Sequence, residues 1–322
     1  MSVFRVYKNL GERILETGLL GEKGSWVNMV NPTPEEIEEV VRCIGLPRDF
    51  LEYPLDEEES SRIEVEEGSV LIIIRVPVIR DSIYDTLPLG IIITENIILT
   101  VCLEELDILS DFYSGRMRGF YTFKKTRFLL QIFYKTALQY LRYLRQIDKK
   151  SEEIQLRLHR STQNEELIRL LGLQKSLVYF TTSLRANQVV MEKLLKSHLA
   201  KDAEALGLNT GLIKMYAEDE DLLEDVIIEN KQALEMSDIY AQILSSTMDA
   251  YASVISNNLN IVMKFLTSVT IILMIPTMLF SLYGMNVELP YQHSPLAFWG
   301  IILLSVIFAI FVLLVFRKRN ML

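Results

Sequence analysis

The stretch "NIVMKFLTSVTIILMIPTMLFSLYGMN", residues 260–286, decides the fold of this 322-residue chain. From Phe265 to Tyr283 the only ionisable side chain is the terminal tyrosine, and a second run from Leu296 to Phe316 has none. At 1.5 Å per residue, runs of about 19 and 21 residues cover roughly 30 Å, the thickness of the hydrocarbon core of a bilayer. We therefore expect two transmembrane helices.

The charges at the ends of these runs predict their orientation. Lys264 precedes the first run, and three basic residues, 317–319, close the second, whereas the only acidic or basic side chains of the loop 284–295 are Glu288 and the weak base His293. By the positive-inside rule the loop lies outside and both termini lie in the cytoplasm. These basic ends argue against the alternative, a helix pair buried inside a large soluble protein. We expect a plasma-membrane protein, such as one of a bacterial inner membrane, with two spans in contact with lipid.

The remainder of the chain is predicted to be soluble, because the formal net charge is −9 although half of the residues are hydrophobic. Its first part mixes strands, "WVNMVN" (26–31) and "SVLIIIRVPVIR" (69–80), with a hairpin "LGIIITENIILTVC" (89–102) that turns at Glu95 and Asn96. The segment "TPEEIEEVVRCIG" (33–45) has the pattern of a capping box with a glycine stop. This is an α+β domain.

Helical patterns dominate the rest. Apolar residues at three-and-four spacing over 126–147 and 165–198 predict an antiparallel helical hairpin. From Glu218 no proline or glycine occurs until Pro276, so one helix on the order of 100 Å long could run to Tyr283. The expected domains are a cytosolic α/β domain (1–120), a cytosolic helical hairpin (121–217), a stalk and first transmembrane helix (218–283), an outer loop (284–295), and a second transmembrane helix with a basic cytosolic tail (296–322).

A polar stripe follows one face of the long helix. Steps of four and three residues back from Ser281 give Ser281, Thr277, Met274, Thr270, Thr267, Met263, Asn260, Ser256, Ser253, Asp249, Ser246 and Gln242. Ten of these twelve are polar, and polar groups at bilayer depth are expected to face protein or water. A helix interface held by small and polar residues is one explanation. The stripe continues in phase for about six turns beyond the membrane, which favours a parallel bundle of helices around a wet axis.

One chain supplies only one such helix, because the second span is apolar almost all round, with Ser305 its lone hydroxyl. A pore therefore needs several copies, and we expect a homo-oligomer with cyclic symmetry and the second spans outside. The only charge on the stripe is Asp249, and the outer loop has Glu288, so these acids would attract cations.

The motif "YGMN", residues 283–286, ends the first of two C-terminal spans and is followed by a short acidic loop and a basic C-terminus. With residues 260–286 it resembles the CorA family of magnesium channels, which carry a GMN motif. The resemblance implies a funnel-shaped homopentamer that takes up Mg²⁺, with Co²⁺ or Ni²⁺ as alternative passengers, and in which Gly284, Met285 and Asn286 form the selectivity filter. Pore-lining and gate positions, from the resemblance or the stripe, are Asn260, Met263, Leu266, Thr270, Met274, Thr277 and Ser281.

The resemblance also implies closure by cytosolic Mg²⁺ bound between neighbouring subunits. Asp225 matches a sensing aspartate of the stalk, whereas the family's Leu-Glu-Asp stretch corresponds here to Leu51, Glu52 and Tyr53, so the second acid is missing. Asp56 or the run 57–59 would substitute, and we take Asp225, Glu52 and Asp56 as the regulatory set. The alternative for Asp225 is a solvated acidic start to a helix.

Two rival functions stay open: a Zn²⁺ transporter of the same superfamily, and a non-conducting coiled coil for signalling or structure, which would have an apolar seam. We expect no enzyme, because the sequence has no phosphate-binding glycine loop and no nucleophile elbow. The acidic soluble part argues against nucleic-acid binding. Mg²⁺ is expected as the transported and regulatory ion, and no small-molecule substrate other than metal ions is predicted.

Overall fold

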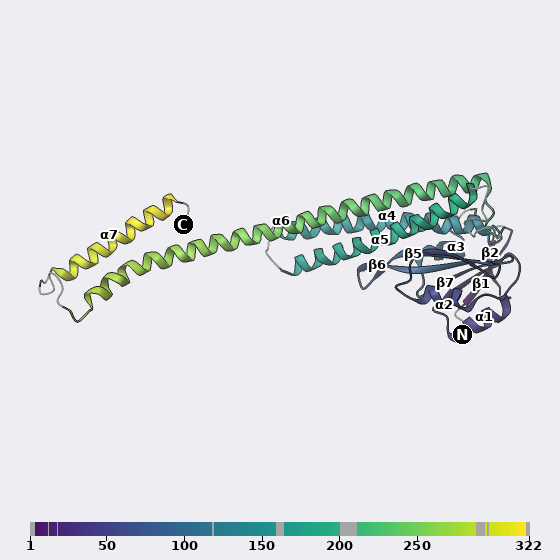
Figure 1. Cartoon of the computed structure of the whole chain (residues 1–322), viewed down its shortest axis with the longest axis horizontal. Helices are drawn as coiled ribbons and strands as arrows, with labels where there is room; N and C mark the ends of the chain where they lie inside the picture. Colours follow the sequence, from purple (N-terminus) through teal and green to yellow (C-terminus); the bar gives the residue numbers. More distant parts are fainter. Residues whose placement is uncertain are drawn as a thin grey trace. The chain divides into compact units, whose positions relative to one another are not determined.

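The computed structural model describes residues 4–11, 13–17, 19–117, 119–158, 164–199, 211–287, 294 and 296–319. Contacts divide the chain into two units, Met1–Ser245 and Ser246–Leu322, which are described in turn (Figure 1). The finer domain boundaries expected from the sequence stay predictions.

The first unit is built on a seven-stranded sheet with the order β2-β1-β3-β7-β6-β5-β4. Its strands are β1 Phe4–Leu10, β2 Arg13–Thr17, β3 Trp26–Val30, β4 Arg62–Glu66, β5 Ser69–Arg80, β6 Ile83–Ile93 and β7 Ile98–Cys102. Only the β3–β7 pair is parallel among the described strands. The strands predicted at 26–31 and 69–80 and the hairpin at 89–102 are confirmed, whereas β1, β2 and β4 were not predicted.

Helices cover both faces of this sheet, as Figure 1 shows. On one face lie α1 (Pro34–Ile44), α2 (Arg48–Glu52) and the short 3₁₀ helix η1 (Tyr53–Leu55). On the other lie α3 (Asp107–Tyr113), α4 (Lys125–Leu158), α5 (Asn164–Leu199) and the start of α6. Along β5, the side chains of Leu71 and Ile73 are buried in the core beneath α1 and α2. Those of Val70, Ile72 and Ile74 are buried in the core beneath α3, α4, α5 and α6. Because both faces are buried there, residues 70–74 of β5 form a continuous apolar run.

The predicted capping of α1 is confirmed. The Thr33 hydroxyl accepts from the Glu36 backbone N–H at 3.3 Å, and the Glu36 carboxylate accepts from the Thr33 N–H at 2.9 Å. Gly45 ends the helix with φ of 76°, a left-handed conformation that glycine adopts without a Cβ penalty.

A side chain of α5 completes the open edge of β5. Pairing of β4 with β5 ends at the Arg62–Ile73 pair, so the backbone of Arg75 has no strand partner on that side. The buried Asn187 supplies one: its amide donates to the Arg75 carbonyl at 2.8 Å, and its oxygen accepts from the Arg75 N–H at 2.9 Å. The Tyr140 hydroxyl of α4 donates to the same carbonyl at 2.9 Å. These bonds fix the α4–α5 hairpin to the sheet.

One helix, α6 (Ala217–Tyr283), contains 67 residues and continues through Pro276, as the sequence predicted. After it comes α7 (Ala297–Lys318). Both helices are long and apolar enough to cross a membrane.

The contact between Gly90 and Pro54 yields a stability test. A Cβ at Gly90 in β6 would lie 2.2 Å from the Pro54 ring, so Gly90→Ala is expected to displace η1 and lower the free energy of unfolding by about 2–3 kcal/mol. Gly172→Ala is the control, because a Cβ there meets nothing within 4 Å and alanine favours a helix. Thermal unfolding followed by circular dichroism measures both, and equal midpoints would refute the steric argument.

Candidate functional site

The predicted filter follows directly on the end of α6. The Gly284 N–H donates to the carbonyls of Phe280 at 3.0 Å and Ser281 at 3.2 Å, so the chain keeps a helical turn beyond Tyr283. Gly284 has no left-handed φ, and a Cβ there would lie 3.3 Å from the Phe280 oxygen. Met285 and Asn286 are exposed. Glu288, predicted to attract cations, lies outside the described residues.

The polar stripe of α6 is uncovered in the single chain, because all twelve of its side chains are exposed. Two of its hydroxyls bond to the helix itself: Thr270 donates to the Leu266 carbonyl at 2.8 Å and Thr277 to the Leu273 carbonyl at 2.9 Å. With their protons used in this way, these hydroxyls present only oxygen lone pairs outward. Such a surface offers acceptors, which suit a hydrated cation.

The shielded side of α6 in the second unit lies opposite the stripe. From Ser268 onward its less exposed positions are Ser268, Val269, Ile272, Ile275, Pro276, Leu279 and Tyr283. At about 100° per residue they cluster roughly half a turn around the helix from the membrane part of the stripe. The other described helix of this unit is α7, whose less exposed positions also recur at three-and-four spacing around Ser305. We conclude that the shielded face of α6 lies opposite its stripe, so the polar face is left free.

The rest of α7 exposes large apolar side chains. They include Phe298, Trp299, Leu303, Ile307, Phe311 and Leu314. A continuous apolar surface of this kind is typical of contact with lipid. Ser305, by contrast, is buried and donates its hydroxyl to the Ile302 carbonyl at 2.9 Å, so it places no free hydroxyl on that surface.

Two predicted acids lie on exposed faces of α6. Asp249 is exposed on the stripe. Asp225 is exposed as well, while its neighbours Leu223, Val226 and Ile227 are buried in the core of the first unit. The buried neighbours fix this part of the helix and leave the Asp225 carboxylate in solvent.

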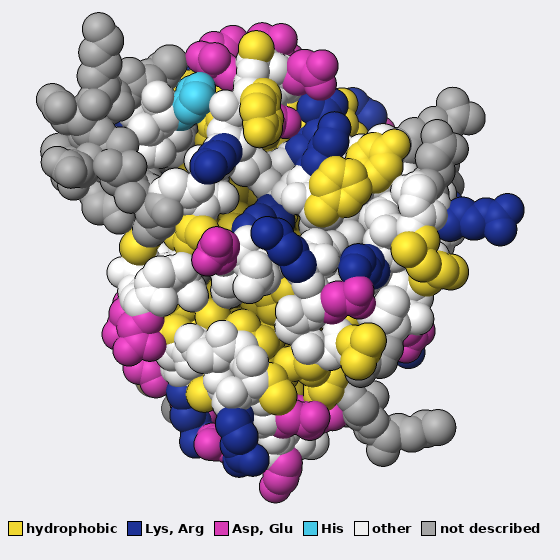
Figure 2. Space-filling view, turned by 90° about the vertical axis from the view of Figure 1, so that its right-hand side faces the viewer, with side chains coloured by type: hydrophobic (Ala, Val, Ile, Leu, Met, Phe, Trp, Pro, Cys, Tyr) yellow, Lys and Arg dark blue, Asp and Glu magenta, His cyan; other side chains and the backbone are white. Residues whose placement is uncertain are grey.

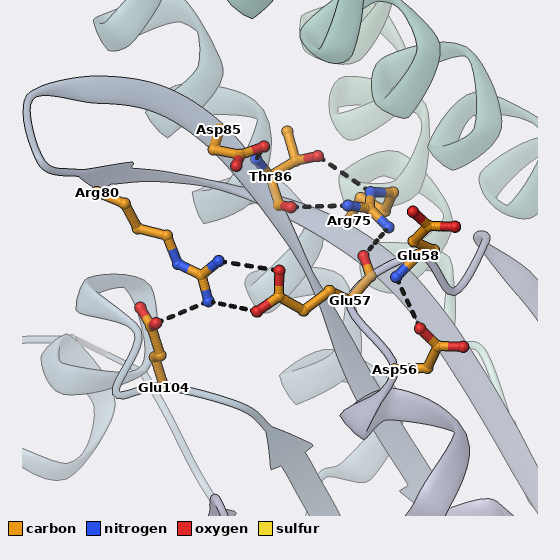
Figure 3. A network of polar contacts seen from close by, with 8 residues as sticks. All are labelled: Asp56, Glu57, Glu58, Arg75, Arg80, Asp85, Thr86 and Glu104. Atoms are coloured by element: carbon orange, nitrogen blue, oxygen red, sulfur yellow. Dashed lines mark hydrogen bonds and ion pairs between the residues drawn. The ribbon is translucent and has the colours of Figure 1, made fainter.

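The acidic loop after η1 is held by arginines (Figure 3). Glu57 accepts two hydrogen bonds from Arg80, at 3.1 and 3.2 Å, and Arg80 also contacts Glu104 at 2.7 Å. These hydrogen bonds, that of Glu57 first, raise the pKa of Arg80 above its usual value. Arg75 donates to the backbone carbonyls of Glu57 at 2.9 Å and of Glu59 at 2.7 Å. Glu57 therefore already has a counter-ion.

Of the other acids near this loop, Asp56 accepts a hydrogen bond at its Oδ1 from the Glu58 N–H at 3.0 Å (Figure 3), and no described residue donates to its other carboxylate oxygen. Glu59 pairs with Arg62. Glu52 contacts the Nε of Arg48 at 2.7 Å at an exposed position.

Tyr53 occupies the position where the resemblance would require an acid. Its ring lies under the Arg62 guanidinium, 4.5 Å from ring centroid to charge, so this side chain serves as a cation–π partner. Within the described part of the chain, no group of three or more His, Cys, Asp or Glu side chains could hold a metal. One chain thus does not bring Asp225, Glu52 and Asp56 together, and their shared role stays a prediction for an assembly.

Sequence reasoning missed the roles of Arg80 and Glu104. Glu57, Arg80 and Glu104 come from three separate segments that only the sheet brings together, so no sequence spacing identifies them. The Arg48–Glu52 pair has i,i+4 spacing within α2, and that pattern could have revealed it.

Known proteins are similar to this chain over nearly its whole length. A sequence profile of the family described as CorA-like Mg²⁺ transporter protein matches residues 21–318. The cobalt/magnesium transport protein CorA of Methanocaldococcus jannaschii is 30% identical over 305 residues, 92% of this chain and 90% of the relative. The protein of that name from Thermotoga maritima is 24% identical over 306 residues, 92% of this chain and 83% of the relative. The complete structure of the M. jannaschii CorA magnesium transporter matches with a TM-score of 0.83 and 26% identity, covering 99% of this chain and 98% of that one.

Cysteine labelling can test the two faces of α6. Cys43 is exposed, whereas burial raises the pKa of Cys102 to about 12, so a Cys43→Ser background should be silent toward a charged methanethiosulfonate reagent. In proteoliposomes, cysteines at Thr270 and Thr277 are expected to react at least about tenfold faster than those at Ile272 and Leu279, because thiolates form in water. Faster labelling of the latter pair would contradict the assignment of the faces.

Proposed function

The chain belongs to the family of CorA-like Mg²⁺ transporter proteins, and on this premise we propose that it conducts Mg²⁺ into the cytosol down the membrane potential. This family consists of ion transporters, which agrees with the expectation that the chain is not an enzyme. The observation that carries the proposal is the uncovered polar stripe of α6, which lies opposite the less exposed face of the same helix.

The stripe supports assembly from several copies. A single helix cannot enclose a water path, and its polar side chains would be costly against lipid. A cyclic homo-oligomer, a pentamer in the family that the chain resembles, would turn every stripe toward one axis and leave the apolar α7 helices outside. The chain would lie in the plasma membrane with both termini in the cytoplasm, as the basic residues around the spans indicate.

Gly284, Met285 and Asn286 would form the filter at the outer mouth. Mg²⁺ loses its waters reluctantly, so a filter that contacts the hydrated ion avoids the cost of removing them. The Gly284 carbonyl and the Asn286 amide oxygen are neutral acceptors suited to that contact. The Met285 thioether is a soft ligand that Mg²⁺ does not favour, so its role is to pack and hold its neighbours.

Below the filter, the lining would alternate acceptors with apolar rings. Ser281, Thr277, Thr270 and Asn260 supply oxygens, those of the two threonines being acceptors only. Met263, Leu266 and Met274 would form constrictions that close by losing their water. Asp249, and Glu288 in the outer loop, would concentrate cations at the two ends. A potential of 100 mV contributes about 2.3 kcal/mol per charge, hence about 4.6 kcal/mol for Mg²⁺.

Cytosolic Mg²⁺ would close the channel by binding between copies. Asp225 of one copy is free to meet Glu52 and Asp56 of the next, because it is exposed and Asp56 keeps an unused carboxylate oxygen. Binding of Mg²⁺ would neutralise this group of acids and hold the copies together, and its loss would leave them to repel one another.

Co²⁺ and Ni²⁺ are further candidate passengers, and the names of both relatives include cobalt. The rival Zn²⁺ transporter would differ at the middle residue of the filter, where this chain has Met285. A non-conducting coiled coil is disfavoured, because the seam of α6 is polar.

The filter assignment predicts the effect of Asn286→Ala. In liposomes that contain a Mg²⁺-sensitive dye, this variant should show an initial influx at least about tenfold slower than the native protein at 100 mV, because the hydrated ion loses acceptors at the mouth. Asn258→Ala removes an amide from α6 at a position off the stripe; it is the control and should match the native protein. No voltage-driven Mg²⁺ influx through the native protein would overturn the proposed function.

The regulatory assignment predicts the effect of Asp225→Ala. Half-inhibition of influx by internal Mg²⁺ should require at least about threefold more Mg²⁺, because one carboxylate of the site is gone. Asp238→Ala removes the same charge from the same helix, where Asp238 pairs with Arg185 at 3.6 Å, and should leave inhibition unchanged. If Asp225→Ala is inhibited like the native protein, Asp225 is only part of a solvated helix start.

A further inference from the structure

A large cavity opens in the first unit where α4 and α6 begin. Its volume is about 920 Å³, within the range of small-molecule sites. Figure 2 looks onto this end of the unit and shows basic side chains gathered near the middle of the face, with apolar side chains beside them. None of the residues assigned to transport or regulation lines this cavity.

Positive charge is in excess in this cavity. Its lining holds five cations and three acids, hence a formal surplus of two positive charges in a chain whose total is −9. Arg127 is matched by two of the acids, Glu218 at 3.4 Å and Asp219 at 3.3 Å. Four lysines then face a single remaining carboxylate, that of Glu95. The surplus is therefore made of lysine ammonium groups.

One of these lysines, Lys125, lies close enough to two others to be repelled by them. Burial lowers the pKa of Lys125, and the positive charges of Lys23 and Lys214 lower it further, against the opposing effect of Glu95. The Lys125 ammonium group is held in place by hydrogen bonds to two backbone carbonyls, those of Thr94 and of Glu95, the latter at 2.8 Å. A fixed central ammonium group with two cationic neighbours is stabilised when an anion binds among them.

Two exposed aromatic rings stand in the same lining. Tyr216 is 73% exposed and Phe123 is 56% exposed, which are high values for such large apolar side chains. Phe123 has a fixed support, because a Cβ added to Gly24 would lie only 3.2 Å from its Cβ. Exposed rings beside cations are typical of sites that stack a planar group attached to phosphate.

We propose that this cavity binds a polyphosphate anion of the size of a nucleoside triphosphate. Lys23, Lys125 and Lys214 would contact the phosphate oxygens as point charges, and Tyr216 and Phe123 would stack on an attached base. The shared chemistry is a chain of phosphates, whether nucleotide or inorganic. This inference concerns a function other than the proposed transport, and it does not depend on the transport proposal.

Calorimetric titration of the full-length protein in detergent with EDTA tests the proposal, with ATP, inorganic triphosphate and adenosine as probes. ATP should bind saturably and adenosine should not. The Lys23→Glu/Lys214→Glu variant should bind ATP at least about tenfold more weakly, because attraction turns into repulsion.

Tyr216→Ala should weaken ATP binding and leave triphosphate binding unchanged, if the base is stacked. Tighter binding of ATP than of triphosphate identifies a nucleotide site, and equal binding identifies an inorganic polyphosphate site.

The matched control is Lys149→Glu/Lys175→Glu, which makes the same charge change at exposed lysines outside the cavity. The proposal is overturned if neither ATP nor triphosphate binds the native protein, or if the control weakens ATP binding as much as the cavity variant. Should the double cavity variant fail to fold by circular dichroism, Lys214→Gln replaces it, and unchanged ATP binding by that variant counts against the site.

Discussion

A polar group without a hydrogen-bond partner is costly in hydrocarbon, and this cost determines how polar groups are placed in the second unit of the protein. Apart from the hydrogen bond that Pro276 removes, the backbone groups in the interior of α6 and α7 can be satisfied within each helix, and the hydroxyls of Thr270 and Thr277 donate to carbonyls one turn earlier. What the chain cannot satisfy alone is the outward side of the stripe. Because the stripe is exposed along its whole length in the single chain, water or further protein has to meet it, which in the proposed function means further copies of the chain.

The first unit is held by contacts that place its acids at defined positions. Burial of β5 on both faces fixes the sheet, and Asn187 ties the helical hairpin to its open edge. Gly90 leaves room for Pro54, so η1 lies directly on β6 and the acidic loop follows from there. The position of Asp56 is thus a consequence of core packing some distance from the acid itself.

Local patterns explain what could be predicted from the sequence. The helix from 217 to 283, strand β5 and the cap at Thr33 depend on spacing, apolar runs and near neighbours, and each is confirmed. Strands β1, β2 and β4 escaped prediction because they are only partly buried and polar residues interrupt their apolar pattern. The Arg80 cluster could not be predicted, because tertiary structure brings its partners together. The filter and regulatory residues remain predictions, since their function requires several copies.

The single stripe on each chain has a genetic consequence. In the proposed ring every copy contributes one wall to the same path, so an ion that crosses must pass all of them. A cell that makes native and defective chains together would assemble mostly mixed rings, and the share of fully native rings falls as a power of the native fraction. Loss-of-function changes on the stripe would then act as dominant alleles, whereas changes that prevent assembly would be recessive.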